Sequence, residues 1–283
     1  MNYKIGILGY GYWGKILYNN LHLMGHNNIT ICDPALTENR LSGYGTPIVK
    51  NKEDLHHCDK IFIATPTYTH YDLCKYFLHM GYDVFCEKPL CIDSTDVHKL
   101  YEIIDEGGGR LFVDWTFLYN DSVWAIKDEI NNCGLPNLIY MNRLNYGPCR
   151  DDVSAKYDLA AHDLSILLYL LGDSNKLKSV KWNEYKLLSG TQNDSCTGII
   201  DFEYTKVVLN ASWAFNSKIR TCYLNFGDSI VVWDDTLKRV TCDDKTMYST
   251  QSPLNNSIQA FLDNGCFAFN RKITEEVSEM LEW

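Results

Sequence analysis

The feature that most constrains the fold is a glycine-rich turn near the start of the sequence, Gly9–Gly14 (G-Y-G-Y-W-G). The apolar run Ile5–Leu8 precedes this turn, and apolar residues with helical spacing follow it from Ile16 to Met24. A dinucleotide pyrophosphate needs this order of strand, turn and helix, because the N-terminus of a helix offers free N–H groups and partial positive charge to an anion. The alternative is a glycine-rich turn in some other α/β domain.

The three glycines have different expected roles in such a site. Gly9 permits the tight turn, Gly11 lets the backbone approach the phosphates, and Gly14 lets the helix pack closely on the strand. A second predicted strand, Ile29–Cys32, ends at Asp33, where an acidic residue would hold the ribose hydroxyls. Asp33 favours NAD over NADP as the cofactor, because a carboxylate repels the 2′-phosphate.

Composition excludes several classes of protein. A chain of 283 residues forms one large domain or two ordinary ones, and its net charge of −10 argues against broad binding of nucleic acid. The 11 cysteines form no C-x-x-C pair, which indicates reduced thiols rather than a disulfide framework or zinc site, so we expect no metal. We expect neither a signal peptide nor a membrane span, and therefore a cytoplasmic protein.

The first part of the chain alternates strands with helices, which predicts a parallel sheet with right-handed crossovers. A loop around Gly43 separates the strand before Asp33 from three further predicted strands, which are Ile61–Ala64, Val84–Cys86 and Leu111–Asp114. Ligands of such sheets lie at the carboxyl ends of the strands. Asp33, Thr65–Thr67 and Glu87–Pro89 all follow strands, so we expect them to surround one crevice.

The pattern changes after about Phe117. The later predicted strands are Leu138–Asn145, Leu177–Leu188, Thr197–Tyr204, Lys206–Phe215, Thr221–Phe226, Ser229–Asp234 and Lys238–Cys242. Short turns between most of them predict an antiparallel sheet. We therefore predict an α/β protein in which residues 1–117 form a doubly wound nucleotide-binding domain and residues 118–283 an α+β domain.

Helices are expected to cover one face of the second sheet, including a strong helix over Asp158–Leu171 and closing helices over Leu254–Leu262 and Ile273–Leu281. The other face is either solvated or used for self-association. Trp213 and Trp233 would favour a homo-oligomer if they point outward, and core tryptophans are the alternative.

Two groups of residues have the chemistry of a catalytic site. Lys88, beside Glu87, can hydrogen-bond a substrate oxygen and stabilise developing negative charge, although a solvent-exposed loop lysine is the alternative. Asp158 and His162 share a helix face at i, i+4. His162 is suited to accept a hydroxyl proton, and the carboxylate can orient it. Asp158 is also a candidate helix cap, and both roles can hold together.

Arg143, Asn145 and Arg150 lie in or just after the strand that leads to this helix. Arginines in such a position can bind phosphates or carboxylates. The alternative is an exposed polar strand end. We favour binding, because the Gly147-Pro148 turn carries the segment towards Asp158.

Four motifs together resemble the Gfo/Idh/MocA oxidoreductases. They are G-x-G-x-x-G, A-T-P-T-x-x-H (Ala64–Thr67 and His70), E-K-P (Glu87–Pro89) and D-x-x-x-H-D (Asp158–Asp163). The match runs in order over essentially the whole chain. The resemblance implies a Rossmann domain followed by a domain with an open antiparallel sheet, NAD as cofactor, and a cis peptide before Pro89.

A narrower similarity connects the chain to the subgroup that acts on UDP-sugars, including UDP-N-acetylglucosamine and UDP-N-acetylglucosaminuronate 3-dehydrogenases. The segments that carry it include G-Y-G-Y-W-G-K, T-F-L-Y-N and S-W-A-F-N-S-K-I-R. The chain departs from the subgroup at Asp114-Trp115, where Gly-His is usual, and at Tyr157, where Trp is usual. The similarity implies oxidation of the sugar C3 hydroxyl to a ketone. We separately expect a homo-oligomer, dimer or tetramer, formed through the C-terminal sheet.

The resemblance also assigns residues. Lys88 and His162 would be the catalytic pair, with Asp158 in support. The cofactor would meet Gly9, Gly11, Tyr12, Trp13, Gly14, Asp33, Ala64, Thr65, Pro66, Thr67, His70, Glu87 and Lys88. The substrate would meet Lys88, Tyr119, Arg143, Asn145, Arg150, Asp158 and His162. The alternatives are another family reaction, on a free sugar, cyclitol or keto-sugar, and a catalytically silent sensor of NAD or sugar, which would be expected to lack the lysine or the histidine.

Overall fold

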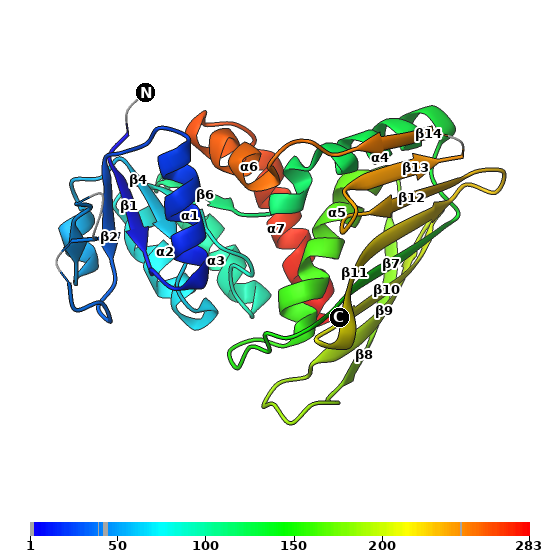
Figure 1. Ribbon diagram of the computed structural model, residues 1–283, viewed down its shortest axis with the longest axis horizontal. Coiled ribbons are helices and arrows are strands. Elements are labelled where there is room, and N and C mark those ends of the chain that lie inside the picture. Colours follow the sequence, from blue (N-terminus) through cyan, green and yellow to red (C-terminus); the bar gives the residue numbers. More distant parts are fainter. Residues whose placement is uncertain (1–2, 39, 42–44, 244) are drawn as a thin grey trace. The chain divides into compact units, whose positions relative to one another are not determined.

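A computed structural model describes residues 3–38, 40, 41, 45–243 and 245–283 (Figure 1). The predicted loop at Gly43 lies outside the described residues. The chain forms two compact units. The first unit runs to Asp114 and also includes Ser257–Glu275, and the second consists of Trp115–Asn256 and Glu276–Trp283.

The first unit is built on a parallel sheet, as predicted. Its described strands are β1 (Ile5–Leu8), β2 (Ile29–Cys32), β3 (Ile48–Val49), β4 (Lys60–Ile63), β5 (Asp83–Cys86) and β6 (Arg110–Val113), in the order β3-β2-β1-β4-β5-β6. The reversal of strand order beside β1 is the point at which doubly wound sheets bind ligands. β3 was not predicted; it is a strand of two residues that pairs with the end of β2.

Helices α1 (Tyr12–Leu23), α2 (His70–His79) and α3 (Ser94–Asp105) alternate with these strands (Figure 1). The central strands are apolar on both faces because helices connect parallel strands across the sheet. Phe62, Phe85 and Phe112 come from three neighbouring strands and are fully buried. Their rings surround the ring of Phe261, at centroid distances of 5.3, 5.5 and 5.8 Å.

Phe261 belongs to the segment that returns to the first unit from the end of the chain. Within the same segment, Asn270 replaces a neighbouring strand at the edge of β6, because its side chain accepts from the N–H of Val113 and donates to the Val113 carbonyl, both at 2.8 Å. The structure therefore divides the chain differently from the predicted 1–117 and 118–283, which assigned this whole segment to the second domain.

An ion cluster ties the returning segment to three strands. The Asp83 carboxylate accepts from Lys60 Nζ and from two nitrogens of Arg110, at 2.5 to 2.7 Å. Lys60 and Arg110 also both donate to Asn264 Oδ1 at 2.8 Å. Burial raises the pKa of Asp83, but the hydrogen bonds from Arg110 and Lys60 outweigh it and hold the pKa below its ordinary value.

We predict that Asp83 contributes to the pH dependence of stability. A carboxyl whose pKa is lower in the folded state stabilises the fold above its unfolded pKa, about 3.9, and loses this contribution as the pH falls through the folded pKa. Asp83→Asn should lower the free energy of unfolding at pH 7 by about 3 kcal/mol, because Lys60 is left buried without its counter-charge. Denaturant unfolding from pH 7 to pH 2 measures this loss, with the exposed Asp59→Asn as control. An equal loss at both ends of the range would contradict the prediction.

The second unit contains a mixed, mainly antiparallel sheet. Its described strands are β7 (Leu138–Tyr146), β8 (Leu177–Tyr185), β9 (Ser195–Phe202), β10 (Lys206–Ser212), β11 (Ala214–Asn225), β12 (Ile230–Asp234), β13 (Arg239–Cys242) and β14 (Lys245–Tyr248), in the order β14-β13-β12-β11-β7-β10-β9-β8. The antiparallel prediction is confirmed except that β7 and β10 run parallel. β14 was not among the predicted strands.

Helices α4 (Asp121–Cys133) and α5 (Ala161–Leu171) lie on one side of this sheet, and the other side carries no helix in the described part of the chain (Figure 1). Helix α6 (Pro253–Leu262) begins in the second unit and ends in the first, and α7 (Phe267–Glu282) does the reverse. Trp213 and Trp233 are 1% and 2% exposed, so they are core residues. None of the described helices is long and apolar enough to span a membrane.

Candidate functional site

The glycine turn has the geometry that the sequence predicts. Gly9 has a φ of +85°, a conformation that favours glycine. A Cβ on Gly14 would lie 2.0 Å from the Gly9 carbonyl oxygen, so only glycine fits where α1 packs on the turn. A Cβ on Gly11 would meet no described atom within 4 Å. The turn therefore leaves open space in front of Gly11, at the N-terminus of α1.

Asp33 lies beside this turn. Its carboxylate accepts from the N–H of Tyr10 at 2.8 Å and from the N–H of Ala35 at 2.9 Å. The two backbone donors fix the orientation of a half-buried carboxylate at the end of β2. This arrangement fits the adenosine end of NAD, since it places an acceptor pair next to the glycine turn. A second feature that fits a ligand is Trp13 Nε1, which is buried without a hydrogen-bond partner among the described residues.

We predict that Asp33 sets the preference between NAD and NADP. Asp33→Asn keeps the acceptor for Tyr10 but removes the charge, and hydrogen bonds to charged groups are stronger by about 1.4 kcal/mol than neutral ones. The affinity for NAD should fall about tenfold, and the affinity for NADP should fall less or rise. Calorimetric titration of both cofactors measures this. Asp59→Asn, which changes a carboxylate that accepts the Lys4 N–H, is the control, and an unchanged NAD/NADP ratio in Asp33→Asn would contradict the role.

Lys88 follows β5 on the same edge of the first sheet. Because β1, β2, β4 and β5 are parallel neighbours, the glycine turn, Asp33, Thr65 and Lys88 all follow carboxyl ends. The Lys88–Pro89 peptide is cis, as the resemblance implied. Lys88 is half-buried rather than fully exposed, and the preceding Glu87 is 8% exposed.

His70 joins the two turns next to Lys88. Its Nδ1 lies 2.9 Å from the Pro89 carbonyl oxygen and its Nε2 lies 3.0 Å from the Thr65 carbonyl oxygen. Its side chain is 1% exposed. His70 therefore holds the Lys88 turn against the Thr65 turn, and Thr65 Oγ1 in turn contacts Thr69 Oγ1 at 2.6 Å. Any part that His70 has in cofactor binding would act through these turns.

In the second unit, the predicted helix over Asp158–Leu171 begins earlier and with a different geometry. Lys156–Ala160 forms a π-helical turn, η4, which continues into α5. Asp158 lies inside this turn and is not a helix cap, because the cap positions of η4 and α5 are Ala155 and Ala160 and neither has a side-chain cap. Its carboxylate instead lies 3.4 Å from Arg150 Nη1.

The segment that was predicted to contact the substrate is held by local contacts. Arg150 donates two hydrogen bonds to Asp152, at 2.9 and 2.6 Å, in addition to its contact with Asp158. Burial lowers the pKa of Arg150, but Asp152 and Asp158 outweigh it and keep the guanidinium charged. Asn145 donates to the Gly147 carbonyl at 2.6 Å. Tyr119 is half-buried, and its carbonyl oxygen accepts from Asn256.

Arg143 differs from the expected surface arginine. It is 2% exposed, and its Nε and Nη2 donate to Asp163 Oδ1 at 3.0 and 2.6 Å. The contact of Arg143 with substrate therefore stays a prediction. Asp163, to which the sequence analysis gave no role, is its partner. Burial raises the pKa of Asp163 although Arg143 opposes the shift.

The residues around His162 were also missed. Phe117, in a 3-10 turn η3 (Thr116–Tyr119), contacts the His162 ring edge-to-face at a centroid distance of 5.1 Å. Arg143 and Arg220 place their guanidinium groups 4.4 and 5.7 Å from the Phe117 ring centroid. A signal was available for Arg143, because it alternates with Ile139 and Met141 on the buried face of β7.

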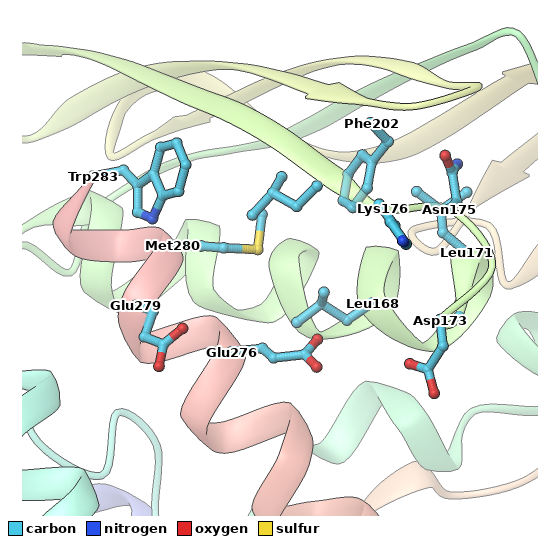
Figure 2. Close-up of a pocket in the computed structure, with 12 residues that line it drawn as sticks. Leu168, Leu171, Asp173, Asn175, Lys176, Phe202, Glu276, Glu279, Met280 and Trp283 are labelled. Carbon is cyan, nitrogen blue, oxygen red and sulfur yellow. The ribbon is translucent and has the colours of Figure 1, made fainter.

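A separate cavity of about 300 Å³ lies at the C-terminal end of α5. Figure 2 shows Trp283 and Phe202 on one side of it and the carboxylates of Asp173 and Glu276 on the opposite side. The residues that line it include none of the predicted site residues. No group of three or more His, Cys, Asp or Glu side chains in the described ranges could hold a metal ion.

A comparison with known protein families agrees with the Rossmann fold of the first unit. Residues 3–115 match the family model GFO_IDH_MocA, described as an oxidoreductase family with an NAD-binding Rossmann fold. The inositol 2-dehydrogenase of Rhizobium meliloti is 24% identical over 187 residues, which are 61% of this chain and 56% of that protein. The chain thus spans about half the length of the curated relatives it matches.

Two solved structures resemble the whole chain. UDP-N-acetylglucosamine 3-dehydrogenase GnnA from Acidithiobacillus ferrooxidans has a TM-score of 0.86 at 17% identity, covering 99% of this chain and 96% of that one. The WlbA dehydrogenase from Bordetella pertussis, solved with NADH and UDP-GlcNAcA, has a TM-score of 0.83 at 17% identity, covering 100% and 96%. At these identities the likeness shows the fold. The match over residues 3–115 identifies this part of the chain as an NAD-binding Rossmann fold of the Gfo/Idh/MocA oxidoreductase family.

Proposed function

We propose that the protein is an NAD-dependent dehydrogenase that oxidises the C3 hydroxyl of a UDP-N-acetyl sugar to a ketone. The observation that carries the proposal is the common edge of the first sheet. The glycine turn, the oriented carboxylate of Asp33 and the Lys88 turn all follow carboxyl ends of neighbouring parallel strands. We therefore assign the cofactor to this edge, and we assign Lys88, which lies on the same edge, to the substrate oxygen.

The proposed chemistry assigns a role to each of three side chains. His162 accepts the proton of the C3 hydroxyl, and Lys88 donates a hydrogen bond to the same oxygen as negative charge develops on it. Asp158 favours the charged form of His162 as the proton arrives. NAD, when bound, supplies the acceptor for the hydride that leaves the carbon. The balance is one alcohol converted to one ketone, with NADH and a proton released.

The UDP-sugar assignment rests on the subgroup segments of the sequence, such as G-Y-G-Y-W-G-K and T-F-L-Y-N. The fold likeness to GnnA and WlbA is compatible with it. A second candidate is a dehydrogenase of a free cyclitol, favoured by the similarity to the Rhizobium meliloti inositol 2-dehydrogenase. A non-catalytic sensor is less favoured, because the chain retains both Lys88 and His162.

A substrate screen tests the proposal and separates the two enzyme candidates. Purified protein with NAD is offered UDP-N-acetylglucosamine, its uronate, myo-inositol and scyllo-inositol, and NADH is followed by absorbance. We expect turnover of a UDP-sugar, with the product identified as the 3-keto sugar by mass spectrometry after trapping. Turnover of a cyclitol alone would replace the proposed substrate, and NAD binding without any turnover would favour the sensor.

We also propose a homo-oligomer formed through the helix-free side of the second sheet. Tyr140 and Tyr223 are cross-strand neighbours there, each 41% exposed, and Ile199 and Ile230 are 46% and 49% exposed. A patch of large apolar side chains on an uncovered sheet is typical of an interface between subunits.

The oligomer has its own test. Tyr140→Arg with Tyr223→Arg should reduce the molar mass in solution, because a second copy would have to bury four charges. Light scattering after size exclusion measures the mass. Lys75→Glu, at an exposed position of α2 in the first unit, is the control. A wild-type protein that is already a monomer would contradict the proposal.

A further inference from the structure

One side of the candidate base His162 faces an aromatic ring that is in contact with buried charged side chains. Such a cluster is unusual in the interior of a sheet domain. Arg143 in β7 and Arg220 in β11 are directly opposite each other in the antiparallel register. Like charges in this position repel each other. Asp163 compensates Arg143, and Asp235 compensates Arg220 through a contact of 3.4 Å.

Both guanidinium groups face the ring of Phe117. Their distances of 4.4 and 5.7 Å from the ring centroid are within the range of cation–π attraction. Trp233 adds a third contact at 6.2 Å, and the His162 ring contacts Phe117 at 5.1 Å. Phe117 therefore has an orientation fixed by two strands, and it contacts the imidazole directly.

The ends of the network are also anchored. Asp163 is the next residue after His162, so its bond to Arg143 fixes the first turn of α5 against β7. Asp235 accepts from Asn120, which caps α4 directly after η3, at 3.4 Å. The backbone segments that carry Phe117 and His162 are thus both connected to the arginine pair.

A contribution to the stability of the fold does not by itself explain this network of charged side chains. Arg143 Nη1 and Asp163 Oδ2 are buried without hydrogen-bond partners among the described residues. Burying charged groups with unsatisfied atoms is costly, and well-packed apolar residues are often as stable or more so. The charges require another explanation.

We propose that Phe117 is a positioning residue for His162, and that Arg143, Asp163 and Arg220 hold Phe117 in the orientation that this role requires. The inference rests on the proposed function, in which His162 accepts the hydroxyl proton. Proton transfer depends steeply on geometry, since a displacement of about 1 Å can lower a rate about 100-fold. Phe117 confines the imidazole through its ring contact and forms no hydrogen bond with it.

The test begins with Phe117→Leu, which removes the ring and keeps an apolar side chain. We expect kcat to fall between about 10-fold and 100-fold, while KM and the Kd for NADH stay within about twofold. Phe202→Leu is the matched control. Phe202 is 2% exposed in the same unit and lines the cavity at the other end of α5 (Figure 2), so it loses packing without contacting His162. Its kcat should not change.

A second measurement needs neither substrate nor cofactor. In protein labelled with ¹³C-histidine, the His162 ring signal is assigned by its loss in His162→Gln. We expect one sharp signal in the wild type and in Phe202→Leu, and a shifted signal with exchange broadening in Phe117→Leu. Arg220→Met, at a partly exposed position, should give a smaller change of the same kind and lower kcat about threefold.

The outcomes separate the inference from the function on which it rests. An unchanged His162 signal and unchanged kcat in Phe117→Leu, with a slow His162→Gln, would overturn the positioning role alone. A broadened His162 signal in Phe117→Leu, with full activity in His162→Gln, would instead overturn the proposed base. If Phe117→Leu does not fold, Arg220→Met decides, and a sharp, unshifted His162 signal in that variant would reject the proposal.

Discussion

Lys88→Met is expected to lower kcat about 1,000-fold while leaving the Kd for NADH within about twofold. The substitution keeps the length of the side chain but removes the donor that would face the developing oxyanion, and loss of one such donor lowers kcat about 100-fold to 1,000-fold. The loss of kcat should be at the upper end of this range, because a lysine contributes charge as well as a hydrogen bond. Steady-state kinetics with the substrate from the screen and fluorescence titration of NADH measure the two quantities.

The matched control is Lys99→Met, the same substitution in the same unit. Lys99 is half exposed and pairs with Asp96 on the surface of α3, so its removal should change neither quantity. His162→Gln should lower kcat by about 100-fold to 10,000-fold for loss of the general base. Full activity in both Lys88→Met and His162→Gln would contradict the proposed catalytic pair. A large loss of NADH affinity in Lys88→Met would assign the lysine to the cofactor instead.

The parts of the fold that the sequence predicts are those governed by local rules. The glycine turn is one of them, because Gly9 needs a positive φ and Gly14 has no room for a side chain. Asp33 is another, because a residue that directly follows the neighbouring strand lies beside that turn. The parallel order of the first sheet follows from the alternation of strands and helices.

The parts that were missed depend on contacts between distant residues. Asn264 and Asn270 form hydrogen bonds with side chains of β4 and β6 and with the backbone of β6. No local sequence pattern predicts such partners. His70 matches a family motif, but the sequence does not say that both its nitrogens face carbonyl oxygens of neighbouring turns.

Arg143 shows how a residue type can draw attention away from the periodicity of a strand. An arginine near a predicted site suggests an anion ligand, and that expectation overrode the alternation that places Arg143 on the buried face with Ile139 and Met141. In the structure it pairs with an internal carboxylate, Asp163. Periodicity was the stronger signal here, because a one-residue shift of register would move every side chain of the strand to the other face.

The buried pair gives the largest expected effects on stability. Arg143→Met leaves the Asp163 carboxylate buried without a counter-charge, and Asp163→Leu leaves the guanidinium in the same state. Each single substitution should lower the free energy of unfolding by about 3–5 kcal/mol. The double variant Arg143→Met/Asp163→Leu contains neither charge. Its free energy of unfolding should return to within about 1 kcal/mol of the wild type, or exceed it.

Urea unfolding followed by tryptophan fluorescence suits this measurement. Trp13 is the one tryptophan of the seven in the first unit, so the signal reports mainly on the second. The exposed pair Lys206–Asp201 in the same sheet is the control, and its single variants should stay within about 0.5 kcal/mol. Losses in the double variant as large as the sum of the two singles would show that the two residues stabilise the fold independently.

The same double variant distinguishes stability from positioning. If the pair served only to hold the second unit together, restoring the free energy of unfolding would restore kcat as well. If the pair holds Phe117 against His162, the double variant should be stable and slow, because it lacks the guanidinium 4.4 Å from the Phe117 ring. A stable enzyme with wild-type kcat would therefore assign the buried charges to folding alone, and a stable enzyme with low kcat would explain why the sheet retains them.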